Sequence, residues 1–299
     1  MQSITEAQVA EVLDPDAARE ALHRAFAQHG RGQAQVLARH RATAHQDGQA
    51  LAISAMGAIL QADGDLPAVL GTKVYSSRNG KYNFLVSLFS ADTGAALATL
   101  EANEFTRLRT AAASAVAADR LALPDAKTLA IFGAGIQARA HAEALMRVRH
   151  FERVLVCARS GAEAFAAELG AQAVDAATAA AEADVIVTAT RSATPLFDGG
   201  LVKPGAFIAA VGSSTRAARE LDDTLLGRAA LIAVEWRTAA ELEAGDLVNS
   251  TPAHWAELGE LIVTPRPRGP QDIVVYKSVG IGLEDVALAR VVAHSLGVC

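Results

Sequence analysis

The chain has 299 residues, of which 51% are hydrophobic and 20% are charged, with a net charge of -6 and a pI near 5.8. This is the composition of an ordinary globular protein, and its acidic balance argues against nucleic acid or an anionic membrane surface as a partner. We find no secretory signal, no segment that could span a bilayer and no histidine spacing typical of a metal site. The two cysteines imply no disulfide framework, so we expect a cytoplasmic protein. The histidine spacing leads us to expect no metal.

The first 120 residues predict a domain that mixes helices and strands. Asp14 is a favourable N-cap and Pro15 a favourable first residue for an opening helix over 15–29. Further along, strands are expected at 50–55, 70–74 and 82–90, a turn at 91–94 and a long helix at 103–121.

From about residue 128 the pattern changes to short apolar runs that alternate with helical stretches. Strands are expected at 129–132, 154–157, 184–189, 206–211, 231–234 and 273–276, with helices at 138–149 and 162–169 among them. Continuous apolar strands separated by helices predict a parallel sheet that is covered on both faces. The predicted fold class is therefore α/β. A doubly wound domain of Rossmann type occupies residues 123–282 and an α+β domain occupies 1–122, and we also consider a return of residues 283–299 to the first domain.

The segment from Thr128 to Ala138 reads TLAIFGAGIQA, which is a strand, a glycine turn and the start of a helix. Gly133 permits the tight turn, Gly135 lets the backbone approach a pyrophosphate, and Ala138 lets the helix lie close to the strand. The free N–H groups at the start of that helix face the phosphates. We therefore predict a dinucleotide site that includes Gly133, Ala134, Gly135, Ile136 and Gln137.

Five blocks carry a resemblance to a known family over essentially the whole chain. They are Gly71–Lys73, Arg107–Ala115, Gly133–Ala138, Ala210–Gly212 with Glu220–Asp222, and Ser278–Gly280 with Glu284–Asp285. Through them the chain resembles the ornithine cyclodeaminase/mu-crystallin family. The resemblance implies a homodimer built through the first domain, a substrate pocket between the two domains, and nicotinamide chemistry at an imine. The family includes ornithine cyclodeaminases, an archaeal alanine dehydrogenase and reductases of cyclic ketimines, so the reaction stays open.

The resemblance also assigns roles to three cations. Arg109 and Arg41 would hold the carboxylate of a small imino or amino acid, because a guanidinium offers a planar fork of donors to a carboxylate. Lys73 is the best catalytic candidate, since burial beside arginines would lower its pKa and make it an acid or base near neutral pH. Glu284 and Asp285 are interpreted only as acidic residues that favour the N-terminus of a helix.

Ser214 is the first departure from the family pattern. Cyclodeaminases and the alanine dehydrogenase carry an aspartate at this place, which acts as a general base. A serine without a partner base does not do this at neutral pH. With Ser214 limited to hydrogen bonds with the substrate, the site favours hydride delivery to a preformed C=N bond over deamination of ornithine.

The second departure concerns the dinucleotide. The expected acidic residue at the end of the second strand is missing from the stretch Val154–Ser160. Arg159 can pair with a 2′-phosphate and Ser160 can donate a hydrogen bond to it, which favours NADP while NAD stays possible. Five further residues are expected at the cofactor. Ser278 and Gly280 are placed there by the family match, and Thr190, Gly212 and Ser213 by their positions at or just after the ends of strands.

The sequence therefore predicts an NADPH-dependent reductase of small cyclic imino acids such as pyrroline-2-carboxylate and piperideine-2-carboxylate. One alternative is an NAD-dependent ornithine cyclodeaminase, in which Asp47 or Asp198 would have to replace the missing base. Another is a binding protein similar to mu-crystallin that holds NADPH without turnover.

Overall fold

The computed structural model describes residues 1–249 and 255–299, and these form two compact units. The first unit comprises Met1–Arg109 with Ile281–Cys299, and the second comprises Thr110–Gly280. Helix α3 (Asn103–Leu121) contains the boundary between them. Each unit is described by itself below.

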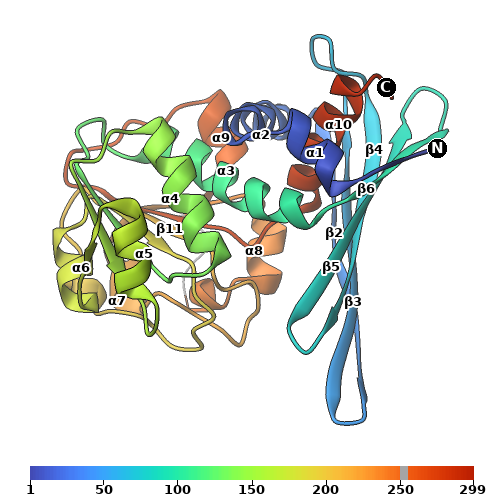
Figure 1. The fold of residues 1–299 in the computed structure, drawn as a ribbon. Coiled ribbons are helices and arrows are strands. Elements are labelled where there is room, and N and C mark those ends of the chain that lie inside the picture. The colour runs from blue at the N-terminus through green and yellow to red at the C-terminus, as the bar shows by residue number, and fades with distance from the viewer. Residues whose placement is uncertain (250–254) are drawn as a thin grey trace. The chain divides into compact units, whose positions relative to one another are not determined.

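The first unit is built on a six-stranded sheet with the order β1-β6-β5-β4-β3-β2, in which only the pair β1 and β6 is parallel. Figure 1 shows the long strands β2 to β5 running side by side. The elements are β1 (Gln2–Ile4), α1 (Glu6–Val12), α2 (Pro15–Gly30), β2 (Ala34–Gln46), β3 (Gln49–Leu60), β4 (Val69–Arg78), β5 (Lys81–Ser90), β6 (Ala96–Glu101) and α10 (Gly282–Ser295).

The predicted helices of this unit are confirmed, and its strands are longer than predicted. Asp14 caps α2 as expected, because its side chain accepts a hydrogen bond of 2.8 Å from the Ala17 backbone N–H. The sequence did not identify β1, α1, β2 or β6.

The two faces of this sheet differ in their surroundings. Along β4, Val69, Lys73 and Tyr75 are buried on the face that packs against α10, whereas Val74 on the opposite face is exposed. Other large apolar side chains that share the open face are also exposed, namely Leu37, Ile53, Ile59 and Leu85. One face of the sheet therefore holds the core of the unit, and the other presents apolar side chains without a cover.

The second unit is built on an eight-stranded parallel sheet with the order β13-β12-β14-β11-β10-β7-β8-β9. Its elements are β7 (Thr128–Phe132), α4 (Ile136–Val148), β8 (Arg153–Cys157), α5 (Ala162–Leu169), β9 (Gln172–Ala173), α6 (Ala176–Glu182), β10 (Val185–Thr188), η1 (Gly199–Leu201), β11 (Phe207–Ala210), α7 (Asp223–Arg228), β12 (Ala229–Val234), α8 (Arg237–Glu243), η2 (Gly245–Leu247), β13 (Trp255–Glu257), α9 (Leu258–Val263) and β14 (Ile273–Lys277).

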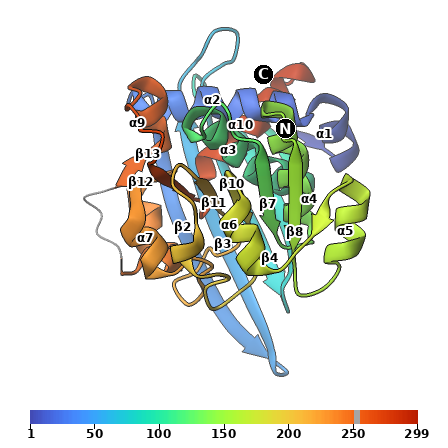
Figure 2. The same ribbon diagram turned by 90° about the vertical axis from the view of Figure 1, so that its left-hand side faces the viewer.

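Every residue of β7, β10, β11 and β14 is buried, so the middle of this sheet is covered on both faces. Figure 2 shows β7, β10 and β11 among the helices of the unit. The predicted doubly wound α/β fold is confirmed. Its continuous apolar strands are the reason that it could be predicted, because a strand buried on both faces has no polar side to alternate with.

Within residues 1–249 and 255–299, no helix is long and apolar enough to cross a membrane. No group of three or more His, Cys, Asp and Glu side chains in these ranges could hold a metal ion.

Candidate functional site

The glycine turn after β7 has the geometry that close approach of a phosphate requires. Gly133 has a φ of 120°, and a Cβ at this position would lie 2.7 Å from the Ala189 carbonyl oxygen, so a larger residue does not fit. Gly135 is the N-cap of α4, and no side chain caps the helix there. The fully buried Ala138 lies under this turn. The start of α4 can therefore offer backbone N–H groups to an anion.

A cavity of about 670 Å³ opens beside this turn at the carboxyl ends of the parallel strands. Its lining includes six of the residues predicted from the sequence to bind the dinucleotide: Gly133, Ala134, Gly135, Arg159, Ser160 and Thr190. The other predicted cofactor residues do not line it: Ile136, Gln137, Gly212, Ser213, Ser278 and Gly280. The location agrees with the rule that open α/β sheets bind ligands beyond the carboxyl ends of their strands.

Charge in this cavity is positive. Besides Arg159, the lining includes Arg139 and Arg191, and within the described chain no Asp or Glu side chain contributes to it. Arg139 forms an ion pair with Glu168 and its guanidinium lies 4.6 Å from the Phe165 ring centroid. Arg159 and Arg191 are exposed, and neither forms an ion pair within the described residues. The sequence pointed to Arg159 alone.

Cys157, at the end of β8, also lines the cavity and is half-buried, and burial raises the pKa of its thiol.

Two buried carboxylates that the sequence reasoning missed hold the loops at this end of the sheet. Glu220 accepts hydrogen bonds from the Thr188 hydroxyl at 2.8 Å, from the backbone N–H and hydroxyl of Thr190 at 2.7 Å each, and from the Gly212 N–H at 2.8 Å. A Cβ on Gly212 would lie 2.1 Å from the Thr190 carbonyl oxygen. The loops after β10 and β11 are therefore fixed to each other through Glu220.

Glu235 does the same for the loop after β14. It accepts hydrogen bonds from the Ser278 hydroxyl, from the Val279 N–H at 2.9 Å and from the Gly280 N–H at 3.1 Å. The polar groups of Ser278 and Gly280 that the sequence assigned to the cofactor are thus held by a carboxylate of the same unit.

Ser213 and Ser214 follow β11. Ser213 is buried, its hydroxyl donates to the Ala218 carbonyl, and its own carbonyl accepts a bond of 2.6 Å from the Lys277 ammonium. Ser214 is half-buried. The two carboxylates considered as substitutes for a base here are both exposed: Asp47 lies in the turn between β2 and β3, and Asp198 is the N-cap of η1.

In the first unit, Lys73 lies at the centre of a buried polar cluster. Its Nζ is 2.7 Å from the Thr106 hydroxyl, 2.7 Å from Asp285 Oδ1 and 4.4 Å from the centroid of the Phe84 ring. Burial lowers the pKa of Lys73 to about 8, Asp285 opposes this shift, and the charge of Arg109 adds to it. The structure thus gives Lys73 an environment suited to proton exchange near neutral pH.

Arg109 is also paired within this cluster. Its Nη1 lies 2.7 Å from Glu284 Oε2, and its Nε lies 3.9 Å from Asp285 Oδ1. The interpretation of Glu284 and Asp285 as residues that only favour a helix N-terminus was therefore incomplete. Glu284 does accept from the Ile281 N–H at the start of α10, but both carboxylates are buried and pair with the two candidate cations.

Arg41 has a different environment. Its Nε donates to the Ser54 hydroxyl at 3.0 Å and its Nη2 to the Tyr75 hydroxyl at 3.1 Å, and both of these acceptors are neutral oxygens. Arg41, Ser54, Tyr75 and Phe84 face one another across β2, β3, β4 and β5, while Lys73 belongs to the next row of the same face. Of the three predicted cations, Arg41 is the one without a carboxylate partner among the described residues.

Comparisons with known proteins agree with this description. The model of the ornithine cyclodeaminase/mu-crystallin family matches residues 1–297. Ketimine reductase mu-crystallin from Mus musculus is 39% identical over 215 residues, which cover 70% of this chain and 68% of the relative. Iminosuccinate reductase from Paracoccus denitrificans is 34% identical over 319 residues, which cover 98% of this chain and 96% of the relative.

Among solved structures, Δ1-pyrroline-2-carboxylate reductase from Thermococcus litoralis, in complex with NADH and L-proline, aligns with a TM-score of 0.89. The two are 28% identical, and the alignment covers 99% of this chain and 98% of that structure. The parallel sheet, the glycine turn and the adjoining cavity define an α/β protein of the nucleotide-binding class. Within that class, the chain belongs to the ornithine cyclodeaminase/mu-crystallin family.

Proposed function

We propose that the protein is an NADPH-dependent reductase of small cyclic imino acids such as pyrroline-2-carboxylate and piperideine-2-carboxylate. The observation that carries the proposal is the buried Lys73 ammonium, held by Thr106 and Asp285 in the row next to Arg41. This arrangement offers a proton donor and a carboxylate-binding cation on one face of one sheet. The named relatives reduce ketimines, iminosuccinate and pyrroline-2-carboxylate, which supports a reaction at a C=N bond.

The second unit fits a dinucleotide. Gly133 leaves room that a Cβ would fill, and the start of α4 has no side-chain cap. A bound NADPH would supply the hydride for the reaction. Arg159 and Arg191, without a carboxylate in the lining, favour the additional 2′-phosphate of NADPH over the free ribose hydroxyl of NADH. The Thermococcus litoralis relative was crystallised with NADH, so the preference has to be tested directly in this protein.

The first unit supplies the groups that bind and protonate the imino acid. Arg41 binds the carboxylate, because its charge is not neutralised by a carboxylate of the described chain. An ammonium has three N–H donors, and Lys73 uses two of them on Thr106 and Asp285. We expect the third to donate to the imine nitrogen. Protonation of that nitrogen makes the neighbouring carbon a better hydride acceptor, and a bound geometry close to attack supplies much of the acceleration.

Deamination of ornithine is not favoured by these residues. It needs a base where this chain has Ser214. Asp47, in the turn after β2, and Asp198, the N-cap of η1, are both exposed. We therefore expect no ammonia release from L-ornithine.

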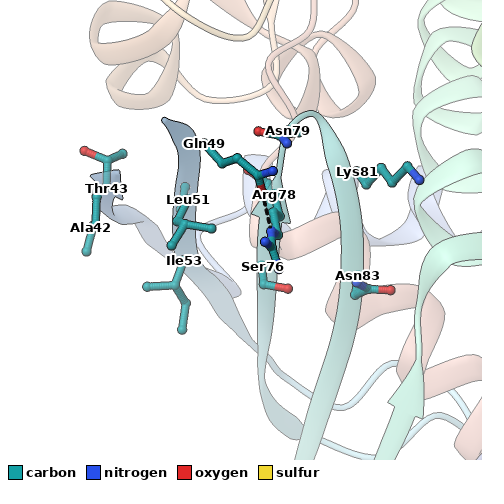
Figure 3. A pocket seen from close by; sticks show the side chains of 13 residues that line it. Ala42, Thr43, Gln49, Leu51, Ile53, Ser76, Arg78, Asn79, Lys81 and Asn83 are labelled. Carbon is teal, nitrogen blue, oxygen red and sulfur yellow. Dashed lines mark hydrogen bonds between the residues drawn. The ribbon is translucent and has the colours of Figure 1, made fainter. Parts of the chain in front are cut away.

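The open face of the first unit supports a homodimer. It carries the exposed side chains of Ile53 and Leu85, and it is hollowed by a cavity of about 820 Å³ toward the ends of the hairpins. Figure 3 shows Leu51 and Ile53 lining this cavity beside Ser76 and Asn83, which belong to the neighbouring strands β4 and β5. A face with this much exposed apolar surface favours burial by a second copy. Light scattering during size-exclusion chromatography should give twice the mass of one chain, and the Ile53→Lys variant should shift it toward one chain.

The function is tested by following NADPH oxidation with pyrroline-2-carboxylate, piperideine-2-carboxylate and iminosuccinate, beside ammonia release from L-ornithine. We expect fast oxidation with one of the cyclic imines and no ammonia. Preference for iminosuccinate would support the proposed reductase activity but replace the cyclic imines as the proposed substrate. Ammonia release without net use of the cofactor would indicate a cyclodeaminase, and tight NADPH binding without any turnover would indicate a binding protein.

A further inference from the structure

We propose that Asp285 is a positioning residue for proton transfer, which aims the Lys73 ammonium and returns it to its charged form after each turnover. The inference rests on the proposed reductase function and extends it to a residue outside the substrate-binding set. Asp285 Oδ1 lies 2.7 Å from Lys73 Nζ, and the two side chains are 0% and 1% exposed. An ion pair so far from solvent has a fixed geometry, because neither partner can turn to water instead.

The second carboxylate oxygen strengthens the argument. Asp285 Oδ2 is buried and has no hydrogen-bond partner within the described residues. A buried polar atom without a partner is costly, and such atoms in native proteins are often found where function requires them. With no donor on Oδ2, the charge of Asp285 is compensated by Lys73 at 2.7 Å and by Arg109 at 3.9 Å, both at Oδ1.

The proton balance of the step shows why this charge is useful. In the proposed reaction, an N–H bond of Lys73 breaks, a new N–H bond forms at the imine nitrogen, and the electron pair stays on Lys73 Nζ. Lys73 is then neutral. The cluster is left with one cation, Arg109, against two carboxylates, Asp285 and Glu284. This excess negative charge raises the proton affinity of Lys73 and so favours its return to the charged form.

All charged neighbours of Lys73 within the cluster come from two helices. Arg109 is on α3, and Glu284 and Asp285 are on α10, whereas Thr106 on α3 and Phe84 on β5 are neutral. On the sheet, Arg41 and Tyr75 lie in the neighbouring row, and Met56 and Val86 face Lys73 across β3 and β5. With Asp285 neutralised, two cations would face one carboxylate, so Lys73 would lose its proton at a lower pH.

The test compares the pH dependence of kcat/KM for imine reduction in the wild type, Asp285→Asn and two matched variants. Glu284→Gln removes a carboxylate from the same helical turn, but one that pairs with Arg109. Thr106→Val removes the neutral hydrogen bond to Lys73. We expect Asp285→Asn to move the alkaline fall in kcat/KM down by about one pH unit, so that activity near pH 8 drops about tenfold relative to acidic pH. Glu284→Gln should shift the alkaline fall in kcat/KM by less than Asp285→Asn does. Thr106→Val should lower kcat and leave the pH of that fall unchanged.

Each outcome is decisive. A uniform loss of activity in Asp285→Asn with an unmoved profile would mean a merely structural role and would overturn the proposal. If Asp285→Asn does not fold, as judged by its thermal transition, Asp285→Glu is measured instead. That variant keeps the charge and displaces Nζ, so we expect a lower kcat with the wild-type profile, and a shifted profile would contradict the proposal. Failure of the wild type to oxidise NADPH with any imino acid would refute the proposed function itself and is recognised before any variant is made.

Discussion

Glu284 Oε2 lies 2.7 Å from Arg109 Nη1, so the guanidinium that the sequence favoured as the main carboxylate clamp already holds a buried carboxylate of its own chain. Arg41, the weaker candidate from the sequence, donates hydrogen bonds to the neutral hydroxyls of Ser54 and Tyr75. The two arginines should therefore respond differently to mutation.

Arg109→Ala should chiefly reduce stability. The change leaves Glu284 buried without its cation, and breaking a buried pair in this way costs about 3–5 kcal/mol. Chemical denaturation should show a lower midpoint with an unchanged slope. The double variant Arg109→Met with Glu284→Met removes both charges and should recover part of the loss. An Arg109→Ala protein as stable as the wild type would refute this role.

Arg41→Ala should chiefly weaken substrate binding. Loss of a charge-assisted contact with the carboxylate corresponds to about 1.5–3 kcal/mol, or about 10- to 150-fold in KM for the imino acid. The side chain is exposed, so the thermal transition should hardly move. His40→Ala, at the neighbouring exposed position of β2, serves as the control. An unchanged KM in Arg41→Ala would assign the carboxylate to another residue.

The reaction should depend on pH in opposite ways in its two directions. Reduction needs Lys73 charged, and its pKa is lowered to about 8, so kcat/KM should be level below pH 8 and fall above it. Oxidation of L-proline with NADP⁺ needs Lys73 neutral and should rise over the same range. Lys73→Met should lose most of the activity in both directions, by about 10²- to 10⁴-fold. If the residual activity of Lys73→Met still showed the wild-type fall near pH 8, another group would be responsible.

The preference for NADPH should depend on Arg159 and Arg191. Replacing either by alanine should raise the KM for NADPH about tenfold and change the KM for NADH little, because only NADPH has the 2′-phosphate. Arg139→Ala is the matched control in the same cavity, since that arginine is paired with Glu168 and should matter less. Equal effects on both cofactors would place these arginines at the pyrophosphate or adenine instead.

Much of the fold could be predicted because the buried elements repeat a simple pattern. The apolar runs that became β7, β10, β11 and β14 are buried on both faces, and the glycine turn at Gly133 follows directly from one of them. Strand β2 was missed because most of its residues are polar and exposed. It is held at the sheet edge by its pairing with β3, which no local pattern reveals.

The candidate site was predicted less completely than the fold. Lys73 and Arg109 stood out as cations in matching blocks, but their partners lie 212 and 175 residues further along the chain. A carboxylate in the first turn of a helix has an ordinary local explanation, and only the packing of α10 against the sheet shows that Asp285 faces Lys73. Glu220 and Glu235 were missed for the same reason, since their donors come from loops that follow other strands.

The most direct test of the central claim is the transfer of label from NADPH that carries deuterium at C4 of the nicotinamide to pyrroline-2-carboxylate. We predict one L-proline for each NADPH oxidised, with deuterium at its α-carbon and no ammonia in the reaction. Proline without deuterium, or oxidation of NADPH without proline, would contradict hydride transfer to the C=N bond.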